Sequence, residues 1–177
     1  TIRTQREGEI DVQFALHGEQ AAGLATKWAQ QAKPGDTIMV GGPGPAKPFF
    51  PDHDFYLAAG DMSALPAIAA NLEALPADAR GMIALEIQHE DDAVPLAKPD
   101  GIDIEWIVNP HPGTQPRLLA DALRAVELPQ GHIAGWAACE FSAMKELRAF
   151  LREQLGLGPR SLYISSYWKL GINEGEH

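Results

Sequence analysis

The sequence predicts an α/β domain with a mostly parallel sheet, preceded by a shorter antiparallel β segment. Between residues 55 and 168, apolar runs of strand length alternate with segments of helical periodicity, which is typical of parallel strands joined by crossover helices. Near the start, apolar and polar residues alternate one by one, which is typical of half-buried antiparallel strands. A stretch rich in proline and glycine separates the two patterns. We therefore expect two segments, residues 1–50 and residues 51–177.

The first segment contains a predicted hairpin, a helix and a short strand. The hairpin pairs "TIRT" across a turn at "REGE" with a strand whose apolar side chains share one face, namely Ile10, Val12, Phe14 and Leu16. A lone hairpin is marginally stable in water, so we expect its sheet to have further strands outside this chain. Helical spacing of Leu24, Trp28 and Ala32 predicts a helix that ends in a turn at residues 33–36. A short strand is expected at residues 37–40.

The second segment has five expected strands and three expected helices. The strands are predicted at residues 55–59, 81–88, 102–108, 132–137 and 161–168, and the helices at 63–75, 116–126 and 141–155. In open parallel sheets, ligands bind beyond the carboxyl ends of the strands. The turn after the first of these strands, "GDMS", is therefore a candidate ligand site.

That turn immediately precedes a helix. We expect Ser63 to cap the helix, with Pro66 accommodated in its first turn. Backbone N–H groups at a helix start attract phosphate or another anion without a glycine motif. The alternative is that Ser63 only caps the helix and Asp61 only forms the turn, and the local pattern leaves both readings open.

Composition excludes several classes of function. A formal net charge of -10 over 177 residues argues against nucleic-acid binding, which needs clustered lysine and arginine. No apolar run is long enough to span a bilayer, and no signal peptide is recognisable, so no membrane insertion is expected. The single cysteine, Cys139, allows no disulfide framework, which favours a cytoplasmic location. The histidines and Cys139 fall into no metal-binding spacing, so we expect no metal site.

Six short stretches carry a family resemblance. "LAAGDMSALPAI" resembles the D-E-T/S-A-L-P-A-I segment of siderophore-interacting proteins, which are FAD-containing ferric-siderophore reductases related to the ferredoxin–NADP reductase superfamily. "TIRT", "LHGEQAAGLATKWA", "PGDTIMVGGPG", "GWAACE" and "SSYWKLG" resemble other segments of that family, in the same order. The resemblance implies a flavin-binding antiparallel β-barrel, of which this chain holds the last part (residues 1–50), followed by a nicotinamide-binding α/β domain (residues 51–177).

The resemblance also implies roles for individual residues. FAD contacts would come from Thr1, Arg3, His17, Gly18, Ala25, Thr26 and Lys27. Contacts near the nicotinamide of NADH or NADPH would come from Asp61, Ser63, Ala64 and Glu140, and contacts with the electron acceptor from Trp168 and Lys169. Simpler roles stay open: a strand-end histidine for His17, a solvated helix face for Lys27, a helix-start acid for Glu140, core packing for Trp168 and a solvated lysine for Lys169.

Two residues depart from the family pattern. Met62 replaces an acidic residue, which weakens any carboxylate chemistry at that turn, and Cys139 stands where glycine is common. Because buried cysteine usually behaves as a small apolar residue, Cys139 is assigned no chemistry.

The function implied is electron transfer from NADH or NADPH through FAD to a ferric siderophore, which releases Fe(II) for iron assimilation. The cofactor carries the chemistry, so no catalytic acid or base and no protein ligand to iron is required. Two alternatives remain: another flavin reductase or electron-transfer module of the same fold, and a non-catalytic siderophore- or nucleotide-binding module. The acidic "HEDD" after the second strand of the α/β segment predicts a preference for NADH over NADPH.

Overall fold

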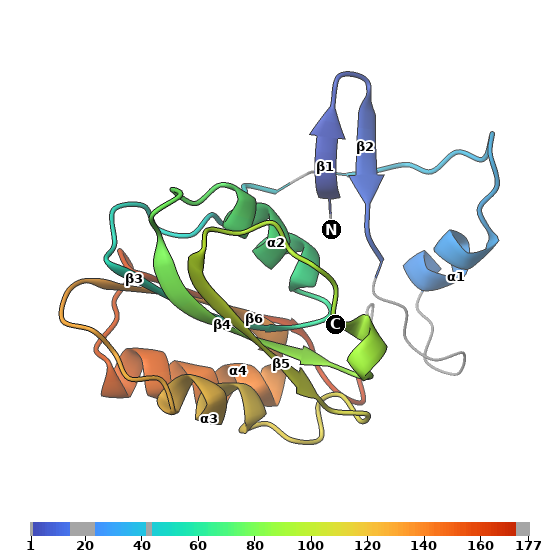
Figure 1. Cartoon of the computed structure of the whole chain (residues 1–177). Coiled ribbons are helices and arrows are strands. Elements are labelled where there is room, and N and C mark those ends of the chain that lie inside the picture. The colour runs from blue at the N-terminus through green and yellow to red at the C-terminus, as the bar shows by residue number, and fades with distance from the viewer. Residues whose placement is uncertain (1, 15–23, 42–43, 173–177) are drawn as a thin grey trace.

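The computed structural model describes residues 2–14, 24–41 and 44–172. Its first part is a two-stranded antiparallel sheet, formed by β1 (Ile2–Arg6) and β2 (Glu9–Val12), followed by helix α1 (Leu24–Gln31). The strands pair Ile2 with Val12 and turn at Gly8, whose φ of 77° is favourable for glycine. Figure 1 shows this hairpin standing above helix α2, with α1 to one side.

The second part is a five-stranded, fully parallel sheet. Its strands are β3 (Phe55–Asp61), β4 (Arg80–Ile87), β5 (Gly101–Val108), β6 (Ile133–Glu140) and β7 (Leu162–Trp168). They lie in the order β5-β4-β3-β6-β7, with β3 at the centre. The chain therefore runs outward from β3 to β5, returns to the other side of β3 as β6, and ends at β7. The predicted fold class, an α/β parallel sheet preceded by an antiparallel segment, is confirmed.

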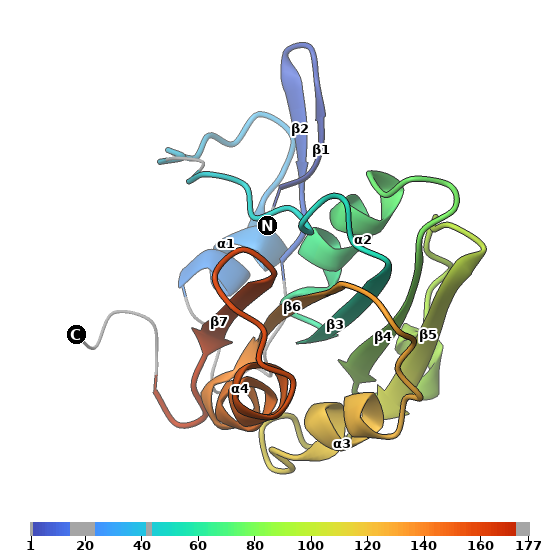
Figure 2. The same cartoon turned by 90° about the vertical axis from the view of Figure 1, so that its left-hand side faces the viewer.

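Helices cover both faces of this sheet. Helix α2 (Leu65–Glu73) lies on one face, and α3 (Leu118–Arg124) and α4 (Phe141–Arg148) lie on the other, as Figures 1 and 2 show. A 3-10 turn, η1 (Glu90–Asp92), follows β4, and a π-helical segment, η2 (Ala149–Gln154), continues α4.

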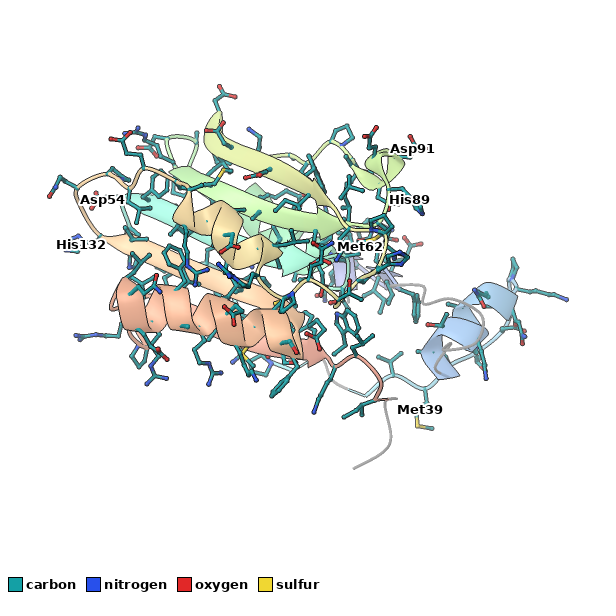
Figure 3. The ribbon with its side chains drawn as sticks, turned by 90° about the horizontal axis from the view of Figure 1, so that it is seen from below. Met39, Asp54, Met62, His89, Asp91 and His132 are labelled. Atoms are coloured by element: carbon teal, nitrogen blue, oxygen red, sulfur yellow. The ribbon has the colours of Figure 1, made fainter. Side chains whose placement is uncertain are left out.

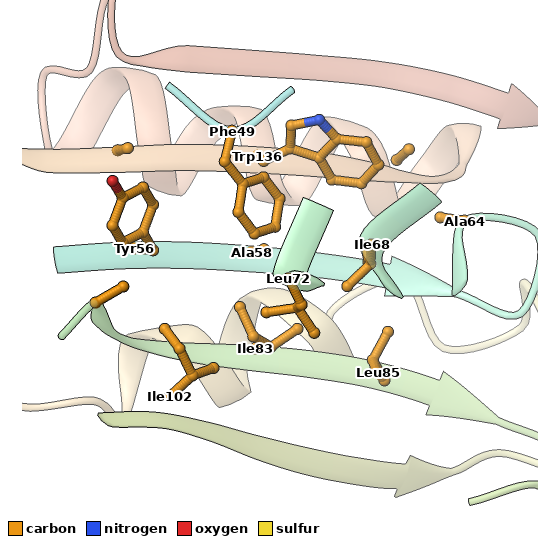
Figure 4. Packing of buried hydrophobic residues seen from close by; sticks show 13 residues of the cluster. Phe49, Tyr56, Ala58, Ala64, Ile68, Leu72, Ile83, Leu85, Ile102 and Trp136 are labelled. Carbon is orange, nitrogen blue, oxygen red and sulfur yellow. The ribbon is translucent and has the colours of Figure 1, made fainter. Parts of the chain in front are cut away.

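The core has two halves, one on each face of the sheet. On the α2 face, Ile68 and Leu72 of the helix pack against Ile83, Leu85 and the strand residues around them (Figure 4). On the other face, Leu119, Leu123, Leu147 and Leu151 pack against alanines of β3, β4 and β6. Small alanines in the central strands let the helices approach the sheet closely. The core thus fixes the carboxyl ends of β3 and β6 side by side.

Several local expectations are wrong. Residues 37–40 form no strand, and Met39 is 97% exposed. The apolar residues of the hairpin are not half-buried in this chain: Ile10 and Val12 are 43% and 40% exposed, because no second layer covers them among the described residues. Ser63 does not cap α2. The helix begins later, at Leu65, with Ala64 at the N-cap position and no side-chain cap, because the Ser63 hydroxyl donates to Asp61 instead.

Candidate functional site

The order of the strands marks one end of the sheet as the place for a ligand. The strands that follow β3 are added on one side of it as far as β5, and the chain then crosses to form β6 on its other side. The carboxyl ends of the two strands at such a switch point border the ligand site in open α/β sheets. Figure 3 shows Met62 and His89 at this end and Asp54 and His132 at the opposite end. Asp61 ends β3 and Glu140 ends β6, so the sequence prediction placed its nicotinamide candidates at the switch point itself.

Asp61 is a buried carboxylate that is fully hydrogen-bonded. One oxygen, Oδ1, accepts from the Ser63 backbone N–H at 2.9 Å and from the Ser63 hydroxyl. The other, Oδ2, accepts from the Glu140 backbone N–H at 2.9 Å and from the Trp168 indole Nε1–H at 2.7 Å. A carboxylate has about four acceptor positions. Asp61 therefore ties together the ends of β3, β6 and β7, and its side chain has no acceptor position left for a ligand.

Glu140 occupies the N-cap of α4 and is also buried. Its Oε2 accepts from the backbone N–H groups of Ser142 and Ala143, the second at 3.3 Å. Its Oε1 accepts from the Leu170 backbone N–H at 3.1 Å. This is the helix-start role that the sequence left open, extended by a bond to the segment after β7.

The segment after β7 carries two of the predicted residues. The Trp168 ring is half-buried, and Lys169 is exposed with its Nζ 5.0 Å from the centre of the Phe141 ring. Lys145, one turn into α4, places its Nζ 5.4 Å from the centre of the same ring. Two ammonium groups thus lie near one aromatic ring in a protein of net charge -10. Lys145 was not among the predicted site residues. Its spacing of four residues from Phe141 on a predicted helix would have placed the two side chains next to each other.

A buried carboxylate that is paired with an amide side chain was also missed. Glu86, which pairs in register with Asp61, accepts from the Asn109 side-chain amide at 2.7 Å. Burial raises the pKa of Glu86, and the Asp61 and Glu140 carboxylates act in the same direction, while the Asn109 hydrogen bond opposes them. Asn109 begins the loop after β5. A charged residue inside an otherwise apolar strand, "MIALEI", was the available signal.

The loop after β5 closes the α3/α4 side of this end of the sheet. Gly113, with φ of 79°, approaches so closely that an added Cβ would lie 3.0 Å from the Trp168 ring and 3.2 Å from the Glu140 side chain. Cys139 is completely buried in the core on this face of the sheet, and its burial, with a further contribution from the neighbouring carboxylates, raises the pKa of its thiol. The thiol is therefore held in its unreactive neutral form.

The turn after β3 offers less to an anion than the sequence suggested. The Ser63 and Ala64 N–H groups already donate to Asp61, and Pro66 has no N–H. The Ala64 side chain is completely buried in the core, so it faces the sheet and not a ligand. Met62 and Gln88 are half-buried neighbours, with Gln88 Nε2 3.7 Å from the Met62 sulfur. This turn, rimmed by buried carboxylates, suits a neutral or cationic ring better than a phosphate.

The acidic turn η1 lies beside it. Asp92 Oδ2 accepts from the backbone N–H groups of Gln88 and His89, at 3.2 and 2.9 Å, which fixes the turn. Glu90 and Asp91 remain exposed, and Figure 3 shows Asp91 near His89 at the edge of the molecule. Two of the three acidic side chains of this turn therefore face solvent.

The predicted flavin contacts lie in the first part of the chain. Thr1, His17 and Gly18 fall outside the described residues. Arg3 forms a bidentate ion pair with Glu73 of α2, in which Nη1 donates to Oε2 at 3.1 Å, and this pairing lowers the pKa of Glu73. On α1, Thr26 is 5% exposed, whereas Ala25 and Lys27 are exposed. The structure thus does not bring Arg3 and the α1 residues to the switch point.

Neither a metal centre nor a membrane-spanning helix is found in the described part of the chain. Within residues 2–14, 24–41 and 44–172, no three histidine, cysteine, aspartate or glutamate side chains are arranged to hold a metal ion. Over the same residues, no helix combines the length and the apolar character needed to cross a bilayer.

Two family models match the chain. The model described as "Siderophore-interacting protein" matches residues 53–171, and the one described as "Siderophore-interacting FAD-binding domain" matches residues 1–47. Among curated proteins, the ferric vibriobactin reductase ViuB of Vibrio cholerae serotype O1 is 34% identical over 178 residues, covering 98% of this chain. The chain spans 65% of the length of that relative.

Solved structures give the same picture. The siderophore-interacting protein SipS from Aeromonas hydrophila is 35% identical, with a TM-score of 0.84 over 98% of this chain and 68% of its own. The siderophore-interacting protein from Acinetobacter baumannii is 27% identical, with a TM-score of 0.86 over 99% of this chain and 71% of its own. The likeness therefore includes both the hairpin segment and the parallel sheet.

Proposed function

The chain belongs to the siderophore-interacting protein family, and from that membership we propose that it is part of a flavin-dependent ferric-siderophore reductase of the cytoplasm. Electrons would pass from NADH or NADPH through FAD to a ferric chelate, with release of Fe(II). The observation that carries the proposal is the pair of lysines at Phe141, a local cationic group at the carboxyl end of the sheet in an acidic protein.

We propose a division of labour between the two segments. Residues 1–50 would contribute to FAD binding through Thr1, Arg3, His17, Gly18, Ala25, Thr26 and Lys27, and residues 51–177 would bind the nicotinamide. Arg3 is neutralised by Glu73, so it could hold a flavin phosphate only by leaving that partner. FAD, when bound, supplies the step from two-electron to one-electron transfer.

The nicotinamide would lie at the turn after β3. Asp61, Ser63, Ala64 and Glu140 border this place, and the buried carboxylates there suit a ring that is neutral or cationic. Because Asp61 has no acceptor position left and Glu140 already accepts three internal hydrogen bonds, direct contacts would come from the turn's backbone and from Met62. These residues would orient the ring and exclude water from it.

Lys169 and Lys145 would hold the acceptor. Ferric complexes of hydroxycarboxylate and catecholate chelators are anionic, and the net charge of -10 repels them from most of the surface. Lys169 and Lys145 each place an ammonium group near the Phe141 ring, so this part of the surface offers positive charge to an anion. Trp168, directly before Lys169 and held by Asp61, would form one wall of the site.

Removing Lys169 tests this proposal. In the full-length FAD-containing enzyme, Lys169→Ala should raise KM for ferric citrate by about three- to tenfold at low salt, and Lys145→Ala should do the same to a smaller extent. Stopped-flow reduction of the flavin by NADH should be nearly unchanged, because the nicotinamide binds elsewhere. Lys98→Ala, which removes an ammonium group that donates to the Ile102 carbonyl far from Phe141, is the matched control. Equal effects on both half-reactions, or on neither, would contradict the acceptor role.

The exposed acidic turn leads to a second expectation. Glu90 and Asp91 would repel the 2′-phosphate of NADPH, so kcat/KM should be higher for NADH. Asp91→Arg should reduce the ratio of kcat/KM for NADH to kcat/KM for NADPH by roughly tenfold. The arginine would attract the 2′-phosphate of NADPH where the aspartate repels it. Asp103→Arg makes the same change of charge on edge strand β5 and should leave the ratio alone. A clear preference of the unaltered enzyme for NADPH would refute the assignment of this turn.

A further inference from the structure

The segment from Trp168 to Leu170 is held at both ends by buried carboxylates. Asp61 accepts from the Trp168 indole N–H at 2.7 Å, and Glu140 accepts from the Leu170 backbone N–H at 3.1 Å. Both carboxylates are at most 5% exposed. Hydrogen bonds to ionised groups are stronger than those between neutral groups, and burial protects them from water. Lys169 lies between these two attachment points.

The two carboxylates are also linked to each other. Asp61 Oδ2 accepts from the Glu140 backbone N–H at 2.9 Å, so a shift of either residue moves the other. Glu140 caps α4, the helix that carries both Phe141 and Lys145. The position of Lys169 relative to Phe141 and Lys145 therefore depends on one connected set of hydrogen bonds.

Further bonds restrict the backbone around Lys169. The Ser166 hydroxyl donates to the Trp168 carbonyl at 3.0 Å, and the Ile172 N–H donates to the Lys169 carbonyl at 3.2 Å. Gly171, with φ of 79°, permits the tight turn that this last bond closes. The loop after β5 covers the other side, with Gly113 against the Trp168 ring. An exposed lysine thus projects from an unusually constrained backbone.

We propose that Asp61 and Glu140 act as a carboxylate clamp, defined by their bonds to Trp168 and Leu170, which positions Lys169 for the anionic acceptor. The inference rests on the proposed acceptor role of Lys169. It assigns the two acids as positioning residues, since every acceptor position of Asp61 is taken by the protein itself. A lysine whose backbone is already ordered loses less conformational entropy when it binds an anion than a lysine on a mobile segment does.

Spectroscopy of the chain tests the clamp without activity. In a ¹⁵N-labelled sample, the Trp168 indole resonance is identified as the one lost in Trp168→Phe. Asp61→Asn should shift that resonance upfield and speed its exchange with solvent by about tenfold or more, because the charged acceptor is gone. Glu86→Gln is the matched control: Glu86 pairs in register with Asp61 and is equally buried, but it bonds Asn109. An Asp61→Asn spectrum with the Trp168 resonance unchanged overturns the clamp.

Kinetics of the full-length enzyme test whether the carboxylate clamp positions Lys169 for the acceptor. Asp61→Asn should raise KM for ferric citrate by about threefold or more, whereas Glu86→Gln, which keeps the bonds to Trp168 and Leu170, should leave that KM nearly unchanged. In the double variant Asp61→Asn/Lys169→Ala, KM should match that of Lys169→Ala alone. Asp61 acts on the acceptor only by positioning Lys169, so its replacement has no further effect once the lysine side chain is gone. Fully additive effects would overturn the positioning role.

The two proposals fail in different ways. If Lys169→Ala alone leaves KM unchanged, the acceptor role is wrong and the positioning role falls with it, even if the Trp168 resonance responds to Asp61→Asn. If Lys169→Ala raises KM but neither Asp61→Asn nor Trp168→Phe does, the acceptor role stands and the clamp is refuted. Trp168→Phe removes the donor and keeps the buried carboxylate, so it replaces Asp61→Asn should that variant not fold.

Discussion

Gly81→Ala is expected to lower the free energy of unfolding by about 3 kcal/mol, the upper part of the range for overpacked sites. Gly81 pairs with Tyr56 where β4 meets the central strand β3. A Cβ at Gly81 would lie 2.2 Å from the Tyr56 carbonyl oxygen and 3.0 Å from its carbonyl carbon. Both are backbone atoms of a paired strand, so no side-chain rotation can relieve the contact. The strands would have to separate.

Chemical denaturation monitored by circular dichroism measures this effect. Gly158→Ala is the control, because no atom lies within 4 Å of a Cβ at Gly158 and its φ is not positive. Its unfolding free energy should stay within about 0.5 kcal/mol of the parent value. If Gly81→Ala were as stable as Gly158→Ala, the close approach of Gly81 to the Tyr56 backbone would be wrong.

Alternation of strands and helices was readable from the sequence because each parallel strand is buried on both faces. Runs such as "FYLAA" and "GWAAC" are continuously apolar, and they form β3 and β6. The predicted starts and ends of helices and strands were less accurate where a side chain forms a different hydrogen bond from the one expected. At the start of α2, the Ser63 hydroxyl could cap the helix or donate to Asp61. The structure shows that it donates to Asp61 and that α2 has no side-chain cap.

The predicted strand at residues 37–40 failed for a different reason. "TIMV" has strong β-propensity, but a strand needs a neighbour to bond with, and the described residues offer none. Likewise, the alternation of Ile10 and Val12 predicted burial, yet these residues are exposed in this chain. Propensity is local information, whereas burial depends on segments that lie elsewhere.

The sequence indicated where the candidate site residues lie, but not which groups they bond. The sequence placed Asp61, Glu140 and Trp168 at strand ends, and parallel topology brings such ends together. Nothing in the sequence showed that the three residues bond one another, because strand order is not written in local patterns. Glu86 was missed for the same reason, because its partner Asn109 lies after another strand. Lys145 was missed although Phe141 is four residues away on the same helix, because its proximity to Lys169 depends on the fold.

Trp136→Ala is expected to lower the free energy of unfolding by about 3–5 kcal/mol, the range for removal of a fully buried tryptophan. Trp136 is 2% exposed on β6 and packs against Phe49 and Tyr163, with ring centres 5.9 and 5.4 Å away (Figure 4 shows Phe49 beside it). Trp106→Ala on edge strand β5 is the matched control. Because that ring is only partly buried, its loss should cost clearly less.

The same tryptophan joins the two segments of the chain. Its indole N–H donates to the Lys47 carbonyl at 2.9 Å, and Asn71 of α2 donates to that carbonyl at 3.2 Å. Trp136→Phe keeps an aromatic ring but removes the donor, so the segment leading to Phe49 should open locally more often than the domain unfolds. Chymotrypsin should then cleave the Phe49–Phe50 bond about tenfold faster under native conditions, since a lost hydrogen bond is worth about 1 kcal/mol or more. Cleavage at the parent rate in Trp136→Phe, with the expected loss of stability in Trp136→Ala, would show that the indole hydrogen bond does not hold this segment.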